Sequence, residues 1–241
     1  MQQSSFLRRV LRAVFGLLFF AVGVFLMVQA NIGLAPWDVF SMGLSYHLPL
    51  SYGQSMVTIS LSIVLLDVLL KEEIGLGTIL DAVLVGSAVD VYTSFGLVPK
   101  CETLLGGLAM MTAGLFIMGI GQVIYMGAAL SCGPRDALLV ALGRRMRKIP
   151  IGGVQILLQA CALTIGWLLG GPVGVGTVVA VFGIGITMQL VFRVLKFEPR
   201  DLVQEGIGQS LRRIGTLVSV KKTADAAGEN SAAGQAENRK D

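Results

Sequence analysis

Long apolar segments separated by short polar connections dominate the first 195 residues of the chain. The segments run from about residue 13 to 30, 53 to 70, 74 to 95, 104 to 128, 152 to 169 and 175 to 195. Each has close to the ~20 residues that an α-helix needs to cross a bilayer. The pattern therefore predicts an all-α membrane protein with six transmembrane helices.

Residues of the first half recur in the same order in the second half. Pro36-Trp37-Asp38 is matched 98 positions later by Pro134-Arg135-Asp136. A Gly-x-Gly-Thr motif and a later glycine recur 99 positions apart, with Gly75, Gly77, Thr78 and Gly86 matched by Gly174, Gly176, Thr177 and Gly185. This ordered set predicts two copies of one unit, residues 1–100 and 101–197. Because each copy has three spans, an odd number, the copies are predicted to be inverted in the bilayer.

A short helix is predicted at each Pro-x-Asp motif, over residues 36–47 and 134–145. Proline suits the first helical position, where its missing N–H would have no partner. These helices are expected to be either re-entrant or amphipathic. Residues 198–220 mix apolar and basic positions in a way typical of a juxtamembrane amphipathic helix. Residues 221–241 are too polar to pack, which predicts a disordered cytoplasmic tail.

Basic residues cluster on one side of the predicted six-helix arrangement, at residues 8–12, 71 and 144–148. The connections at residues 31–52 and 170–174, on the other side, contain neither lysine nor arginine. Cytoplasmic loops of membrane proteins are enriched in these two residues. Both termini are therefore predicted to be cytoplasmic.

Asp38 and Asp136 are the leading candidates for a functional role. An ionised carboxylate within a membrane is costly unless it is paired or solvated, so it usually faces a cavity or a partner. In the first turn of a helix, each could instead cap free backbone N–H groups. Both interpretations stay open. The aspartates oppose anion binding at the helix N-termini, which favours a cation or a zwitterion as the ligand.

Four further residues complete the candidate binding site. Trp37 is either an anchor at the membrane interface or a contact for the ligand. Arg135 is expected to follow the orientation rule or to pair with the neighbouring aspartate, with ligand contact as an alternative. Asp90, matched by the polar Gln189 in the second copy, is interpreted as a proton relay or ligand contact in preference to Asp81.

The repeated glycines are interpreted as packing residues. Gly75 and Gly86 share a helix face, because eleven residues make about three turns. Gly174 and Gly185 repeat this spacing. Small residues let membrane helices approach closely, so tight helix contacts are expected at both positions, and phosphate binding is disfavoured.

The composition argues against several functional classes. Only 14% of the residues are charged, and the net charge of +4 comes from basic residues that flank apolar spans, so nucleic acid is not an expected partner. One histidine and three scattered cysteines provide no metal-ligand spacing, and no catalytic motif is present. No metal, cofactor or enzymatic activity is therefore predicted. The predicted partners are the lipid bilayer and a small molecule, with a homo-oligomer or a cytoplasmic protein as further alternatives.

The motifs resemble those of the YczE/YyaS/YitT family of bacterial membrane proteins. The resemblance rests on residues 30–38, 75–78, 133–136 and 170–177, and it covers roughly residues 5–197. It is closest to the YczE branch, because the soluble C-terminal domain of many YitT-type members is absent. The resemblance implies the membrane fold, in a bacterial cytoplasmic (inner) membrane, more than any chemistry.

The leading functional hypothesis is a small-molecule transporter or exporter of unknown substrate. The alternative is a non-transporting accessory or scaffold protein that supports a biosynthetic or regulatory partner. A continuous polar cavity that reaches Asp38, Asp136 or Asp90 would favour transport. A solidly packed interior would favour the accessory role.

Overall fold

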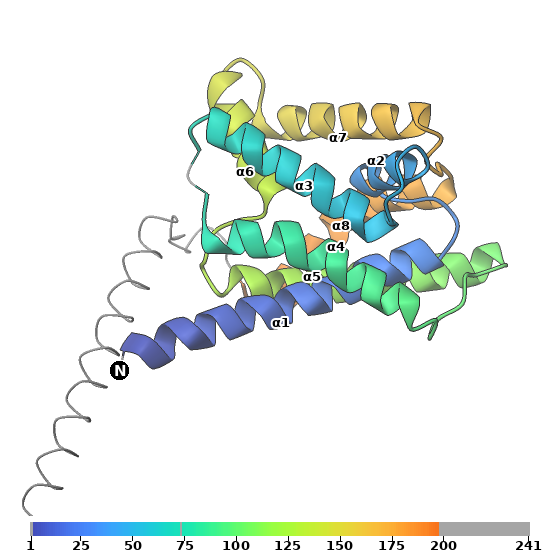
Figure 1. The fold of residues 1–241 in the computed structure, drawn as a ribbon, viewed down its shortest axis with the longest axis horizontal. Helices are drawn as coiled ribbons and strands as arrows, with labels where there is room; N and C mark the ends of the chain where they lie inside the picture. The colour runs from blue at the N-terminus through green and yellow to red at the C-terminus, as the bar shows by residue number, and fades with distance from the viewer. Residues whose placement is uncertain (1, 73, 198–241) are drawn as a thin grey trace, which may run out of the picture.

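The computed structural model describes residues 2–72 and 74–197, and within these ranges the chain is all-helical (Figure 1). The helices are α1 (Gln2–Gln29), α2 (Pro36–Ser45), α3 (Tyr52–Leu69), α4 (Leu76–Ser94), α5 (Leu104–Met126), α6 (Pro134–Arg145), α7 (Ile151–Leu168) and α8 (Val175–Val194). All except α2 and α6 are long and apolar enough to cross a membrane, which confirms the predicted class of six-span membrane protein. The segments predicted at residues 198–220 and 221–241 lie outside the described residues.

The helices pack into two groups. The long-helix bundle contains α1, α4, α5 and α8, in which α1 packs along α5, α4 on α1, and α8 on α5. The short-helix bundle contains α2, α3, α6 and α7, in which α2 packs on α7 and α3 on α6. Figure 1 shows the short-helix bundle in the upper part of the view and α1, α4 and α5 below it. The main contact between the bundles is that of α3 with α4.

Glycines hold α1 and α5 in close contact at two places. A side chain on Gly16 would meet the backbone of Gly121, and a side chain on Gly23 would meet the backbone of Gly114. Gly114 and Gly121 are the counterparts of Gly16 and Gly23 at the separation of 98 positions. Equivalent residues thus make the same contact twice. Close packing of this kind stabilises helix pairs in membranes, where lipid provides no hydrophobic driving force.

Each Gly-x-Gly-Thr motif binds the loop before the Pro-x-Asp motif of the other half. The Gly77 N–H donates to the Leu130 carbonyl over 2.9 Å, and the Gly176 N–H donates to the Ile32 carbonyl over 2.7 Å. Ile32 and Leu130 are again 98 positions apart. Within each motif, the threonine hydroxyl also accepts a hydrogen bond from the first glycine, Thr78 from Gly75 and Thr177 from Gly174. The two motifs therefore position the two loops in the same way.

These two loops share an unusual backbone conformation. Asn31 and Ala129 have φ angles of 54° and 53°, and Gly33 and Ser131 have φ angles of 114° and 110°. A serine in this left-handed region is strained by about 1–3 kcal/mol. Ser131 is buried, and its hydroxyl accepts a hydrogen bond from Thr78 over 3.1 Å. The strained conformation is thus held by the Gly-x-Gly-Thr motif of the opposite half.

Candidate functional site: a cavity between the two helix bundles

A cavity of about 1450 Å³ lies between the two bundles, and residues from all eight helices line it. It is larger than the roughly 300–1,000 Å³ typical of small-molecule sites. Both Pro-x-Asp motifs form part of its wall. Much of the remaining wall is apolar and flexible, because it includes Met27, Met56, Met118, Met126 and Met188.

The short helices α2 and α6 begin at the cavity wall. Pro36 and Pro134 are their first residues, as predicted, and Asp38 and Asp136 lie in their first turns. Neither aspartate makes a capping hydrogen bond to its helix among the described residues. The structure therefore offers no support for a purely capping role, and both carboxylates line the cavity instead.

The aspartates differ in how closely the protein surrounds them. Asp38 is only 6% exposed, whereas Asp136 is exposed to the cavity space. Burial raises the pKa of the Asp38 carboxyl, and the nearby Arg135 charge and Tyr52 hydroxyl act in the opposite direction. The buried Tyr52 hydroxyl has no hydrogen-bond partner of normal geometry among the described residues. Asp38 is thus a carboxyl group for which a bound cation or proton would relieve the cost of burial.

Arg135 links the two Pro-x-Asp motifs across the cavity. Its guanidinium carbon lies 5.2 Å from the centre of the Trp37 ring, within the range of a cation–π contact. The same charge interacts electrostatically with Asp38, Asp81 and Asp136. The middle residues of the two motifs, which differ in the sequence, therefore meet in space and share a cluster of three carboxylates.

The preference for Asp90 over Asp81 differs from the placement seen in the structure. Asp81 lines the cavity, where its carboxylate lies against Gly133 at the start of α6. Asp90 instead accepts hydrogen bonds from the Gly53 N–H, at 2.8 Å, and from the Ser51 hydroxyl, at the start of α3. Its counterpart Gln189 is exposed and is not part of the cavity wall. The sequence favoured Asp90 because its equivalent in the second half is the polar Gln189, whereas the equivalent of Asp81 is an alanine.

The two glycines expected to pack alike also differ. Gly86 is buried, and a side chain there would meet the backbone of Gly53. Gly185 is exposed, and a Cβ atom added to it would have no neighbour within 4 Å. The expectation of tight packing is therefore wrong for Gly185. The physical reason is that α7 does not pack along α8 as α3 packs along α4.

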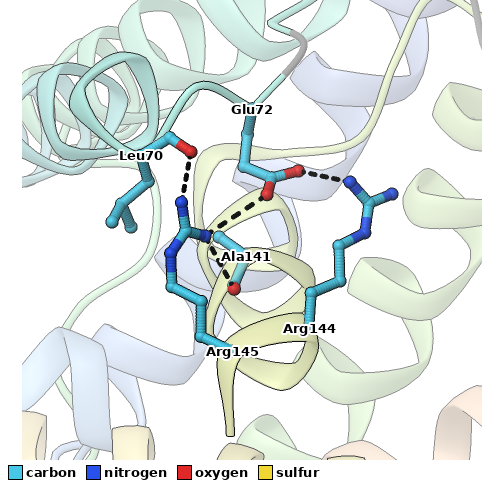
Figure 2. A network of polar contacts seen from close by, with 5 residues as sticks. All are labelled: Leu70, Glu72, Ala141, Arg144 and Arg145. Atoms are coloured by element: carbon cyan, nitrogen blue, oxygen red, sulfur yellow. Dashed lines mark hydrogen bonds and ion pairs between the residues drawn. The ribbon is translucent and has the colours of Figure 1, made fainter. Parts of the chain in front are cut away.

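An ion-pair network lies at one rim of the cavity, where the ends of α3 and α6 meet (Figure 2). Glu72 accepts a hydrogen bond from Arg144 at 3.0 Å and lies 3.6 Å from Arg145. Arg145 also donates to the carbonyls of Leu70 and Ala141, at 2.5 and 3.0 Å. Lys71, Glu72 and Arg144 line this rim. The predicted cytoplasmic cluster of basic residues thus stands at the cavity opening.

Comparison with known proteins shows the relationship of the chain. Residues 7–193 match a family of unknown function, DUF6198. The chain belongs to this family. It is also 30% identical over 182 residues to an uncharacterized protein of Haemophilus influenzae, covering 76% of this chain and 82% of that protein. No solved structure matches.

Two relatives of the chain from Bacillus subtilis confirm the family resemblance inferred from the motifs. The uncharacterized membrane protein YczE is 30% identical over 179 residues, covering 72% of this chain and 80% of that protein. The uncharacterized protein YyaS is 30% identical over 172 residues, covering 69% of this chain and 83% of that protein. The relationship establishes an integral membrane protein, and the chemistry must be inferred from the cavity.

Proposed function

We propose that this protein is a small-molecule transporter or exporter whose binding site is the cavity between the two bundles. The observation that carries the proposal is the placement of both Pro-x-Asp motifs in one cavity wall. In secondary transporters built from inverted repeats, the binding site lies at the repeat interface, near helices that start within the membrane. The recurring contacts of the two halves support this architecture.

The charges of the cavity favour a positively charged ligand. Three carboxyl groups, Asp38, Asp81 and Asp136, interact with the guanidinium of Arg135, and a cation bound among them would stabilise their ionised forms. The methionines of the wall, together with Trp37, offer an adaptable apolar surface that suits organic groups of varied shape. An organic cation or a zwitterion with an apolar part matches both features.

A binding experiment tests the ligand class. Tetraphenylphosphonium and tetraphenylborate have nearly the same shape and opposite charges. Purified protein is expected to bind the cation and to bind the anion at least about tenfold more weakly, a difference of about 1.4 kcal/mol. Asp81→Asn should reduce cation affinity by a similar factor, because it removes one of the three carboxyl groups that interact with Arg135.

Glu102→Gln provides the matched control, since Glu102 is an exposed acid outside the cavity wall. It should leave cation binding unchanged. Equal binding of the two probes, or equal effects of both substitutions, would contradict the proposed ligand class. Binding without uptake into vesicles would favour the alternative of a non-transporting accessory protein.

Cysteine labelling tests the proposed orientation, in which both termini are cytoplasmic and the rim at Glu72 opens to the cytoplasm. Leu48 and Arg147 are exposed residues at opposite ends of the molecule in this arrangement. With the three native cysteines replaced by serine, Leu48→Cys should react with an impermeant maleimide in intact cells. Arg147→Cys should react only after permeabilisation. Labelling of both from the same side would exclude the inverted repeat.

A further inference from the structure

Two helix pairs join the bundles at equivalent places in the two halves. In the first half the pair is α3 with α4, and in the second half it is α7 with α8. The starts of these helices are 99 positions apart, Tyr52 with Ile151 and Leu76 with Val175. The α3–α4 pair is packed, whereas α7 and α8 have almost no contact with each other within the described residues. The two halves therefore adopt different arrangements of the same elements.

Backbone packing and hydrogen bonds close the α3–α4 pair. Gly53 and Gly86 are both buried, and each leaves no room for a side chain on the other. One turn further along α4, Asp90 accepts hydrogen bonds from the Gly53 N–H and the Ser51 hydroxyl. A carboxylate that accepts such bonds at a helix N-terminus is strongly held. The start of α3 is thus fastened to the end of α4.

The corresponding residues of the α7–α8 pair are separated. Gly152 and Gly185 are the counterparts of Gly53 and Gly86, and a Cβ atom on either would have no neighbour within 4 Å. Both line the cavity. Gln189, the counterpart of Asp90, is exposed and makes no hydrogen bond to α7 within the described residues. The cavity is therefore closed between α3 and α4 and open between α7 and α8.

We infer that these two helix pairs are the alternating gates of the transporter, and this inference rests on the transport function proposed above. The structure has the α3–α4 gate closed and the α7–α8 gate open. In the opposite state, the short-helix bundle tilts against the long-helix bundle. Gly152 then packs on Gly185, and the Gln189 side-chain oxygen accepts a hydrogen bond from the Gly152 N–H. Asp90 at the same time releases the start of α3.

Each bundle is held together well enough to move as one body. In the short-helix bundle, the backbones of α2 and α7 touch at Gly43 and Gly166, and Arg145 ties α6 to the end of α3. In the long-helix bundle, the paired glycines of α1 and α5 provide the fixed centre. Contacts inside each bundle are thus the same before and after the tilt, and only the two gates exchange partners.

The hydrogen bonds that close the two gates differ in strength. This difference decides which gate is closed in the absence of ligand. Asp90 offers a charged acceptor to two donors at the start of α3. Gln189 offers a neutral acceptor, and the residue before α7 is Pro150, which has neither a hydroxyl nor an N–H. Hydrogen bonds to charged groups are the stronger ones. The state with the α3–α4 gate closed is therefore favoured, and Asp90 is the residue that biases the equilibrium.

Disulfide formation across the open gate tests the inference without any ligand. The Ser51 and Asp90 side chains are in hydrogen-bond contact in the closed gate, and the equivalent residues of the open gate are Pro150 and Gln189. The full chain with Pro150→Cys and Gln189→Cys, and with native cysteines replaced by serine, should form this disulfide slowly. Adding Asp90→Asn should accelerate it about tenfold, the effect of weakening one charge-assisted hydrogen bond.

Ser87→Ala is the matched control, because the Ser87 hydroxyl bonds only to its own helix, at the Val83 carbonyl. It should leave the rate unchanged. Ser51→Ala, which removes the hydroxyl that donates to Asp90, should also accelerate the disulfide, and it tests the inference even where Asp90→Asn fails to fold. An unchanged rate in folded Ser51→Ala protein overturns the inference. Rapid disulfide formation in the parent, or a cross-link between two chains, overturns it as well.

The outcome is distinguishable from that of the ligand experiment. A disulfide rate that responds to Asp90 and Ser51, without binding of tetraphenylphosphonium, would retain the gates and reject the cationic ligand. Binding of the cation with an unresponsive disulfide rate would retain the site and reject the gates. The two proposals therefore stand or fall on separate measurements.

Discussion

Leucine in place of Gly86 is expected to destabilise the folded protein by about 1–3 kcal/mol or more, as overpacking of a filled interior does. A side chain on Gly86 meets the Gly53 carbonyl and the Met56 side chain, and the backbone of α3 would have to move away. Leucine in place of Gly185 should change the stability by less than about 1 kcal/mol, since surface substitutions away from special features have small effects. No atom lies within 4 Å of a Cβ at this position.

Unfolding of the purified variants in detergent, followed by circular dichroism, measures the difference. Because Gly86 and Gly185 are equivalent residues of the two halves, each serves as the control for the other. Equal destabilisation by the two leucines would show that both glycines are packed, and the open arrangement of α7 and α8 would then be incorrect. Gly185→Leu should nevertheless slow transport, because the leucine side chain obstructs closure of the α7–α8 gate.

The fold was largely predictable because it depends on local and periodic features. Six apolar segments of membrane-spanning length were visible in the hydropathy, and proline at the first helical position marked the starts of α2 and α6. The offset of 98 positions also identified Pro36 with Pro134, which begin two short helices at the wall of one cavity. These signals are carried by single segments or by their repetition.

The candidate site was predictable only in part, because it depends on how the two halves are packed. The motifs indicated Asp38 and Asp136, which do share a cavity. The polar counterpart of Asp90 in the second half favoured Asp90, which fastens α3, over Asp81, which lines this cavity. Both are acids on the same helix, and the difference comes from the neighbours that each one meets. A repeated sequence also implies equal packing of its copies, so the unequal gates could not be foreseen.

The charges of the two Pro-x-Asp motifs are expected to be essential for transport and nearly irrelevant to stability. Asp38→Asn and Asp136→Asn keep the size and shape of each side chain. The structure shows no capping hydrogen bond that asparagine would lose. The remaining losses are the interaction of each carboxylate with the positive end of its helix, about 0.3–1 kcal/mol, and its interaction with Arg135, which is offset because a buried charge is removed. The free energy of unfolding of each variant should therefore lie within about 1 kcal/mol of that of the parent.

Transport should respond far more strongly, because each substitution removes one carboxylate from the cluster around Arg135. The initial rate of tetraphenylphosphonium uptake into vesicles that contain the purified protein, above the passive rate of protein-free vesicles, measures this effect. We expect both variants to lose uptake, with Glu102→Gln retaining it. Asp38 also predicts a pH dependence, since burial raises the pKa of its carboxyl. Acidification through that raised pKa protonates the group in the folded protein and should weaken binding of the cation.

The Asp38→Asn variant separates this titration from every other effect of acid. In the parent, cation affinity should fall as the pH is lowered, and the fall should begin above the ordinary range of an aspartate. In the variant, the affinity should be lower at neutral pH, and its pH dependence should be flatter, because asparagine does not titrate. Full uptake by both asparagine variants would show that the carboxylates of the two motifs take no part in handling the ligand. A pH profile that Asp38→Asn leaves unchanged would show this for Asp38 alone.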